Sequence, residues 1–243
     1  MEGYEPGRSF DEEAAAIYDD QPRGDEGDAV AFLEQLAAGG PALELAIGTG
    51  RIAIPLAARG VSVAGIDISE PMVARLRAKP GGERIPVAMG DFSQVPVSGT
   101  YRLVYLVFNS LFNLLSQEEQ VRCFENVAGH LEEGGAFVLE TFVPGYLHRL
   151  RDDQYVDAEA IAVEEVWLDV GRHDPVRQVL EESHVRLAGG GVRVYPIVCR
   201  YAWPSELDLM ARIAGLRLRE RWASWQREPF GAASRNCISV YER

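Results

Sequence analysis

Ala42-Leu43-Glu44-Leu45-Ala46-Ile47-Gly48-Thr49-Gly50-Arg51-Ile52-Ala53 is the stretch of sequence that decides the fold. Apolar side chains at every second position are typical of a buried strand, and the two glycines that follow permit a tight backbone turn. Residues 51–59 then carry apolar side chains near helical spacing, and Gly60 marks the expected helix end. A second apolar run, 61–66, ends on Asp67. The stretch therefore predicts a strand–helix–strand unit of the nucleotide-binding type, with an acid about 20 residues beyond the glycines.

The spacing Gly48-x-Gly50-x-x-Ala53 also fits the fingerprint of NAD- and FAD-binding proteins. A dinucleotide places its pyrophosphate at this helix N-terminus, where carboxylates are unfavourable neighbours. Here Glu44, Asp67 and Asp91 converge on the carboxyl ends of three predicted strands. Three carboxylates favour a cationic ligand with hydroxyls, such as S-adenosylmethionine (SAM), whose carboxylate Arg51 can pair with. We expect SAM as the cofactor and keep an NAD-dependent oxidoreductase as an alternative.

Four segments resemble the motifs of class I SAM-dependent methyltransferases. Residues 44–50 resemble motif I, with Ala46 where a glycine is commonest, and residues 64–69 resemble the element whose acid holds the ribose hydroxyls. Residues 90–92 resemble the element that meets the adenine. Residues 104–109 and 131–140 resemble the later motifs, so that the resemblance covers roughly residues 40–142. It implies an α/β fold, with a Rossmann-like, doubly wound, mostly parallel seven-stranded sheet.

The resemblance also implies which residues hold the cofactor and its product, S-adenosylhomocysteine (SAH). In relatives an N-terminal helix folds over the cofactor, and a tyrosine near its end closes the pocket. The expected cofactor-binding residues are Tyr18, Glu44, Ala46, Gly48, Gly50, Arg51, Asp67, Ile68, Asp91, Phe92, Phe108 and Asn109.

The composition limits the classes of partner that are expected for this chain. The formal net charge of -13 repels polyanions, so neither nucleic acid nor an anionic membrane is expected as a partner. No apolar run approaches the ~20 residues of a membrane span, and no signal-peptide pattern opens the chain. Three widely spaced cysteines, Cys123, Cys199 and Cys237, are expected to be reduced core residues of a cytoplasmic protein without a metal site.

The chain divides into three predicted parts. Residues 1–40 are expected to form a helical lid, with a helix that begins at Ser9. Residues 41–143 and 204–243 form the SAM-binding body. Residues 144–203 depart from the alternating pattern, because three extended segments, 161–170, 176–187 and 192–203, follow one another. They predict a small antiparallel β cap inserted after the fifth strand, whose strands could also pair between subunits of a homodimer. Such a cap resembles those of bacterial small-molecule methyltransferases of the sugar N,N-dimethyltransferase or natural-product type.

Methyl transfer from a sulfonium requires alignment of the acceptor, exclusion of water and, for some acceptors, removal of a proton. We expect a small-molecule acceptor that is methylated on N or O, and we keep a non-catalytic SAM-binding module as a second alternative. The candidate catalytic residues are His148, His184 and Tyr146. The candidate substrate-binding residues are Ser110, Phe112, Glu140, Arg200 and Trp203.

Overall fold

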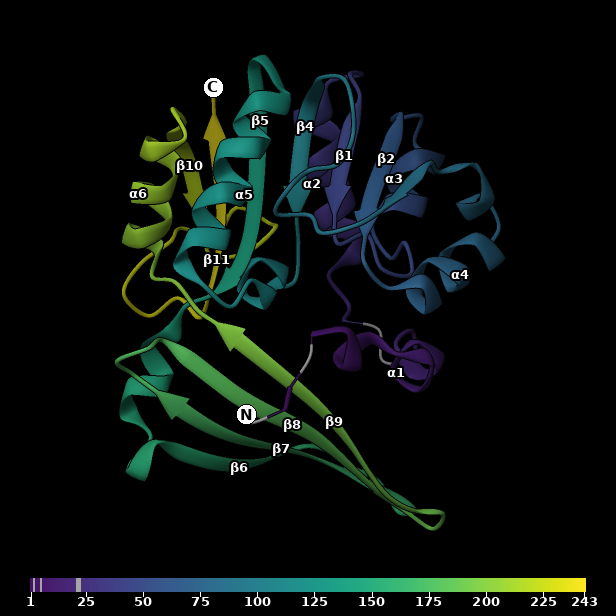
Figure 1. Cartoon of the computed structure of the whole chain (residues 1–243), viewed down its shortest axis with the longest axis vertical. Coiled ribbons are helices and arrows are strands. Elements are labelled where there is room, and N and C mark those ends of the chain that lie inside the picture. The colour runs from purple at the N-terminus through teal and green to yellow at the C-terminus, as the bar shows by residue number, and fades with distance from the viewer. Residues whose placement is uncertain (2, 5, 21–22) are drawn as a thin grey trace.

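The chain forms two sheets, one above the other in Figure 1. The computed structural model describes residues 1, 3–4, 6–20 and 23–243. The larger sheet has seven strands in the order β10-β11-β5-β4-β1-β2-β3, and the smaller sheet has four in the order β6-β7-β8-β9. The strands of the larger sheet are β1 (Ala42–Leu45), β2 (Val63–Asp67), β3 (Val87–Met89), β4 (Tyr101–Leu106), β5 (Leu131–Phe142), β10 (Arg217–Trp222) and β11 (Asn236–Glu242). The fold class predicted from the sequence is confirmed.

Strand direction in the larger sheet follows the predicted doubly wound pattern. The pairs among β3, β2, β1, β4 and β5 are parallel, and β11 is antiparallel to both of its neighbours. Every residue of β1 is buried, as expected for a central strand covered on both faces. The carboxyl ends of the parallel strands point toward the smaller sheet in Figure 1, which is where α/β sheets place their ligands.

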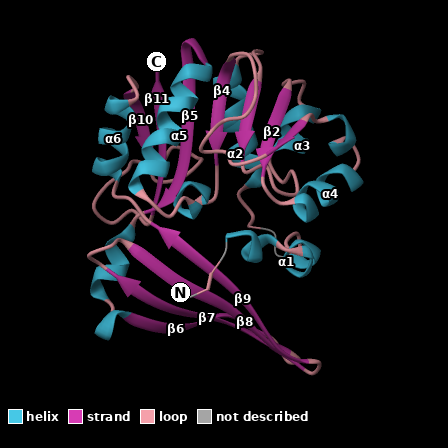
Figure 2. Ribbon diagram, viewed as in Figure 1, coloured by secondary structure: helices cyan, strands magenta, loops and turns pink. Residues whose placement is uncertain are grey.

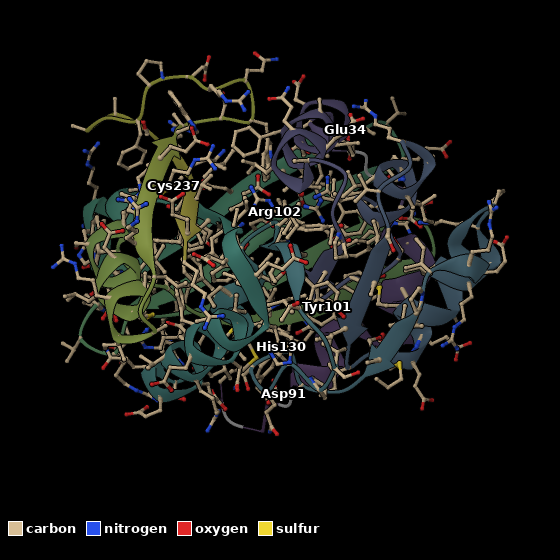
Figure 3. The ribbon with its side chains drawn as sticks, turned by 90° about the horizontal axis from the view of Figure 1, so that it is seen from above. Glu34, Asp91, Tyr101, Arg102, His130 and Cys237 are labelled. Carbon is tan, nitrogen blue, oxygen red and sulfur yellow. The ribbon has the colours of Figure 1, made fainter. Side chains whose placement is uncertain are left out.

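Helices cover both faces of the larger sheet. One core contains residues of α2 (Glu26–Ala37), α3 (Ala53–Ala58) and α4 (Glu70–Ala78); the other contains residues of α5 (Gln117–His130) and α6 (Pro204–Ile213). Figure 3 shows Glu34 of α2 and His130 of α5 on opposite sides, with Arg102 and Tyr101 of β4 between them. All three cysteines are buried and free. Among the described residues, no helix has the length and apolar character that crossing a membrane requires.

The start of the expected N-terminal helix differs in the structure. The helix expected from Ser9 is instead a short 3-10 helix, η1 (Pro6–Phe10), followed by α1 (Glu12–Ile17). The N-cap is Asp11, whose carboxylate accepts a hydrogen bond from the Ala14 amide at 3.0 Å. The Ser9 hydroxyl donates to the Pro196 carbonyl instead, at 2.6 Å.

The smaller sheet, which we call the cap sheet, also differs from the prediction. It has four strands: β6 (Gln154–Ile161), β7 (Glu165–Asp174), β8 (Val179–Ala188) and β9 (Gly191–Arg200). The sequence predicted three extended segments and missed β6. This edge strand is largely exposed, and its Asp, Glu and Ala residues are depleted in strands, so no hydrophobic alternation marks it.

Candidate active site

A cavity lies at the carboxyl ends of β1 and β4, with an empty volume of about 300 Å³. Much of the wall comes from residues that the sequence singled out. The lining residues are Tyr18, Glu44, Ala46, Ile47, Gly48, Thr49, Arg51, Ile52, Val107, Phe108 and Ser110.

The turn after β1 forms the floor of this cavity. Ala46, Gly48 and Gly50 have φ angles of 54°, 56° and 77°, so all three adopt the left-handed conformation. Glycine adopts this conformation without cost, whereas a Cβ raises its energy by roughly 1–2 kcal/mol. Ala46, the residue that departs from the motif, is therefore strained but keeps the same backbone path.

Glu44 lies beneath the turn with only 2% of its surface exposed. The Tyr105 hydroxyl donates a hydrogen bond to Glu44 Oε2 at 3.0 Å. Burial raises the pKa of Glu44 from 4.5 to about 8, although the Tyr105 hydrogen bond and the charge of Arg51 oppose the shift. The carboxyl group is thus largely protonated at neutral pH, and a nearby cation would favour its ionised form.

Asp67 ends β2 beside the same turn. Its Oδ2 accepts a hydrogen bond from the Gly48 amide at 2.7 Å, and its Oδ1 accepts one from the Ser69 amide at 2.8 Å. Burial raises the pKa of Asp67. Each carboxylate oxygen can accept more than one hydrogen bond, so the pair of oxygens suits a vicinal diol such as a ribose.

The loop after β4 is fixed by the end of β5. Phe108 and Asn109 have φ angles of 52° and 61°. Glu140 Oε2 accepts a hydrogen bond from the Phe108 amide at 2.7 Å, and the Glu140 carbonyl accepts one from the Asn109 amide at 3.0 Å. The Asn109 side chain in turn accepts from the Phe142 amide. Glu140, expected to bind the substrate, positions this loop through these hydrogen bonds, and burial raises its pKa.

Two other expected site residues lie away from the cavity wall. Phe112 has no exposed surface and packs edge-on against Phe142, so it is a core residue in this structure, and its expected contact with a substrate stays a prediction. Arg200 is buried, and its guanidinium donates to Gln120 Oε1 at 2.6 Å and Glu206 Oε1 at 2.7 Å. These contacts hold β9 to α5 and α6, which gives Arg200 a structural role.

The residues expected around the adenine are less closely grouped. The Asp91 carboxylate accepts hydrogen bonds from the Ser93 amide and hydroxyl, both at 2.8 Å, and so caps its own turn after β3. Phe92 is buried in the core, whereas Ile68 is 61% exposed. An exposed apolar side chain beside Asp67 remains available to an adenine ring.

The N-terminal segment closes over the glycine turn through polar contacts that sequence reasoning missed. Asp19 accepts hydrogen bonds from the Thr49 hydroxyl and from Lys79 Nζ, both at 2.7 Å. The Ser69 hydroxyl donates to the Phe10 carbonyl at 2.6 Å. These partners are about 30 to 60 residues apart, so no local sequence pattern connects them.

The cap sheet turns one face toward the N-terminal segment and the loop after β4. Arg193 pairs with Glu13 of α1 at 3.2 Å, and the Cys199 thiol lies 3.9 Å from the Asn113 side chain. Figure 2 shows α1 beside β9, between the two sheets. We call the side chains on this side of the sheet the cap face. Its members in β6 to β9 include Tyr155, Glu159, Trp167, Asp169, Glu182, His184 and Tyr195.

Acidic and aromatic groups surround His184 on the cap face. His184 Nδ1 lies 2.6 Å from Asp169 Oδ1, and this hydrogen bond raises the pKa of His184. The Trp167 and Tyr195 rings stack at 5.9 Å. Within the described ranges, Glu159, Asp169 and His184 place ligand atoms within 4.8 Å of one another, but the 2.6 Å bond makes this cluster a histidine–carboxylate pair.

The remaining catalytic candidates are His148 and Tyr146. The Tyr201 hydroxyl lies 3.1 Å from His148 Nε2 and 2.7 Å from His173 Nε2, so it bridges the two rings. Trp203 packs beside His148, with ring centroids 5.4 Å apart. Burial and the charge of Glu182 raise the pKa of Tyr146 to about 12, so its phenol stays protonated near neutral pH.

Comparison with known proteins places this site in context. A family described as "Methyltransferase domain" matches residues 42–135. The chain superposes on the CcbJ methyltransferase from Streptomyces caelestis with a TM-score of 0.93 and 39% identity, covering 98% of this chain and 99% of that one. A cypemycin N-terminal methyltransferase from a Streptomyces species is 27% identical over 83% of this chain and 82% of its own length. SAM-bound CalS10, an amino pentose methyltransferase from Micromonospora echinaspora, shares the fold at 20% identity, with a TM-score of 0.69 and 94% and 95% coverage of the two chains.

Proposed function

The chain belongs to the SAM-dependent methyltransferases, and we propose that it transfers a methyl group to an amine nitrogen of a small natural-product acceptor. The observation that carries this proposal is the cap face. Half-buried carboxylates of Asp169 and Glu182 lie there among aromatic rings. Carboxylates and aromatic faces both attract ammonium groups, whereas a hydroxyl acceptor has no need of negative charge.

The printed descriptions of relatives support the choice of nitrogen. Cypemycin N-terminal methyltransferase and the amino pentose methyltransferase CalS10 are both named for amine-bearing substrates. The net charge of -13 also favours a cationic acceptor over an anionic one.

The residues of the cavity fit SAM. Asp67 offers two oxygens to a ribose diol, and Glu44 lies beneath the turn where the sulfonium and ammonium of the cofactor supply positive charge. When bound, SAM supplies a methyl group on a sulfonium, which the lone pair of an amine displaces in line while the sulfur leaves as a neutral thioether. An NAD-dependent oxidoreductase fits these residues less well, because the pyrophosphate of NAD would lie beside these buried carboxyl groups.

His184 is the base that we propose for an amine that enters as its ammonium form. Asp169 holds His184 Nδ1, so Nε2 is directed away from that pair and can accept the proton before attack. Tyr146 keeps its proton and can donate a hydrogen bond to the acceptor. His148 already contacts Tyr201 and is a weaker candidate. In this proposal residues 1–40 form the lid and residues 144–203 form the cap that holds the acceptor.

Matched acceptors test the proposal. Pairs of amino sugars and cyclic amino acid amides, each with its hydroxyl analogue, are incubated with SAM, and SAH release and product mass are measured. We expect release with the amines and at least a hundredfold less with the hydroxyl analogues, about 2.7 kcal/mol of discrimination. Equal or faster release with the hydroxyl analogues would refute the choice of nitrogen.

Two further expectations accompany this proposal. We propose a cytoplasmic protein, testable by fractionation of the producing cells, and a homodimer, testable by sedimentation of the purified chain. A single species with the mass of one chain, 26.8 kDa, would rule out the homodimer at the concentration used.

A further inference from the structure

Arg23 lies against two aromatic residues of the cofactor cavity. Its guanidinium carbon lies 3.0 Å from the centroid of the Phe108 ring and 5.4 Å from that of Tyr18. Phe108 and Tyr18 both line the cavity at the glycine turn. The side chain therefore reaches from the N-terminal segment to the loop after β4.

Arg51, the residue that the sequence favoured for the cofactor carboxylate, is already engaged. Its Nη1 lies 3.1 Å from Asp25 Oδ1 and 3.2 Å from Glu26 Oε1. Two partly buried carboxylates thus neutralise this guanidinium before any cofactor binds. A third carboxylate at Arg51 would meet the two negative charges already beside it.

Glu26 connects the two arginines. Its Oε1 accepts hydrogen bonds from the Arg23 amide at 3.1 Å and from Arg51, and its Oε2 accepts one from the Gly24 amide at 3.0 Å. These hydrogen bonds to backbone and side chain lower the pKa of Glu26, outweighing its partial burial. Glu26, itself held by Arg51, therefore fixes the backbone at Arg23, whose guanidinium lies over the Phe108 ring.

Arg23 has positive charge without a matching anion. In the ranges that the structure describes, no carboxylate lies within ion-pair distance of its guanidinium, although most other cavity-side cations are paired. Burial lowers the pKa of Arg23 and the nearby charge of Arg51 lowers it further, while Tyr18 and the charge of Asp25 oppose the shift. A desolvated cation beside a like charge is unfavourable unless an anion joins it.

We propose that Arg23 binds the carboxylate of the methionyl part of SAM, and that the Glu26–Arg51 pair is the support that positions it. This carboxylate is the anionic group of the cofactor, and the planar guanidinium can hold both of its oxygens at once. Because Arg23 belongs to the N-terminal segment, the same contact draws the lid onto the bound cofactor. Arg51 becomes a positioning residue rather than a cofactor ligand.

Two ligands, one with the amino acid part that carries the carboxylate and one without it, test this role through their dissociation constants. SAH carries the amino acid part, whereas 5′-methylthioadenosine has the same adenosine and sulfur without it. Calorimetric titration of the full chain gives the ratio of their dissociation constants. In Arg23→Gln we expect SAH to bind about ten- to a hundredfold more weakly while methylthioadenosine is unchanged, so the ratio falls by that factor.

Arg51→Gln is the matched control, because it removes the neighbouring guanidinium on the same cavity wall. Its ratio should fall by less than that of Arg23→Gln, and Arg23→Lys should lie between the wild type and Arg23→Gln. An unchanged ratio in Arg23→Gln would overturn the proposal, including the case in which both ligands weaken equally. A larger fall in Arg51→Gln than in Arg23→Gln would also overturn it, because Arg51 would then be the residue that meets the carboxylate.

Discussion

Replacing Glu44 by Gln removes a titration that couples stability and cofactor binding. The side chain is almost fully buried, and its pKa rises from 4.5 to about 8 on folding. The folded chain therefore holds a proton that the unfolded chain has released between these pH values. Stability is fully present below pH 4.5 and falls as the pH rises through about 8, by about 5 kcal/mol. This loss is comparable to the whole stability of a small domain.

The same titration affects SAM binding in the opposite direction. At about pH 7 the protonated form of Glu44 exceeds the ionised form by about tenfold, so ionising it for a cationic ligand costs roughly 1 kcal/mol. Affinity for SAM should rise about tenfold between about pH 7 and pH 9, with proton release on binding. In Glu44→Gln the pH dependence of stability and the pH dependence of SAM affinity should both be much smaller. The amide keeps the shape of the carboxyl group and does not titrate.

Urea unfolding at a series of pH values measures how the free energy of unfolding depends on pH. Calorimetry in buffers of different ionisation enthalpy counts the protons released when SAM binds. The acids Asp67, Glu140 and Glu182 also have raised pKa values and titrate in both proteins. The difference between wild type and variant therefore isolates Glu44. If Glu44→Gln keeps the stability slope and the proton release of the wild type, the reasoning about this buried carboxyl is refuted.

Three further predictions concern packing, strain and the cap. Phe112→Ala should lower the free energy of unfolding measured in urea by about 3–5 kcal/mol, because the ring is fully buried. Normal stability with a raised KM for the acceptor would instead support a role of Phe112 in substrate binding. Ala46→Gly should stabilise the protein by about 1 kcal/mol, since φ at this residue is 54°, and an unchanged melting temperature would argue against strain there. Asp169→Asn should lower the pKa of His184, although the charges of Glu182 and Glu159 remain nearby. The acid limb of the pH–activity profile should therefore move to lower pH. An acid limb that stays in place would argue against His184 as the base.

The sequence was sufficient for the cofactor half of the fold because its signals are local. The alternation before Gly48, the glycine turn and Asp67 lie within one strand–helix–strand unit, and each residue is set by its immediate neighbours. The seven-stranded order then follows from the family resemblance, with β11 antiparallel beside β5. The start of the helix at 117–130 is equally local, because Ser116 and Glu119 form a capping box.

The site was harder to predict where contacts join distant segments. Glu140 was expected at the substrate, but its carboxylate holds the Phe108 amide across two neighbouring strands. Arg51 is the basic residue nearest the glycines, yet Asp25 and Glu26 of the N-terminal segment neutralise it. Arg23 lies in a polar stretch without periodicity, so its position depends on tertiary contacts alone. The edge strand β6 was missed for a related reason, because an exposed strand needs no apolar pattern.

Turnover with SAM labelled with carbon-13 in its methyl group tests the central claim most directly. The label is followed by NMR in a mixture of an acceptor that carries both a free amine and a free hydroxyl. The account predicts that the label appears as an N-methyl carbon, and that in Asp169→Asn the acid limb of its rate of appearance lies at lower pH than in the wild type. A label found on oxygen, with the amine left unmodified, would contradict the account.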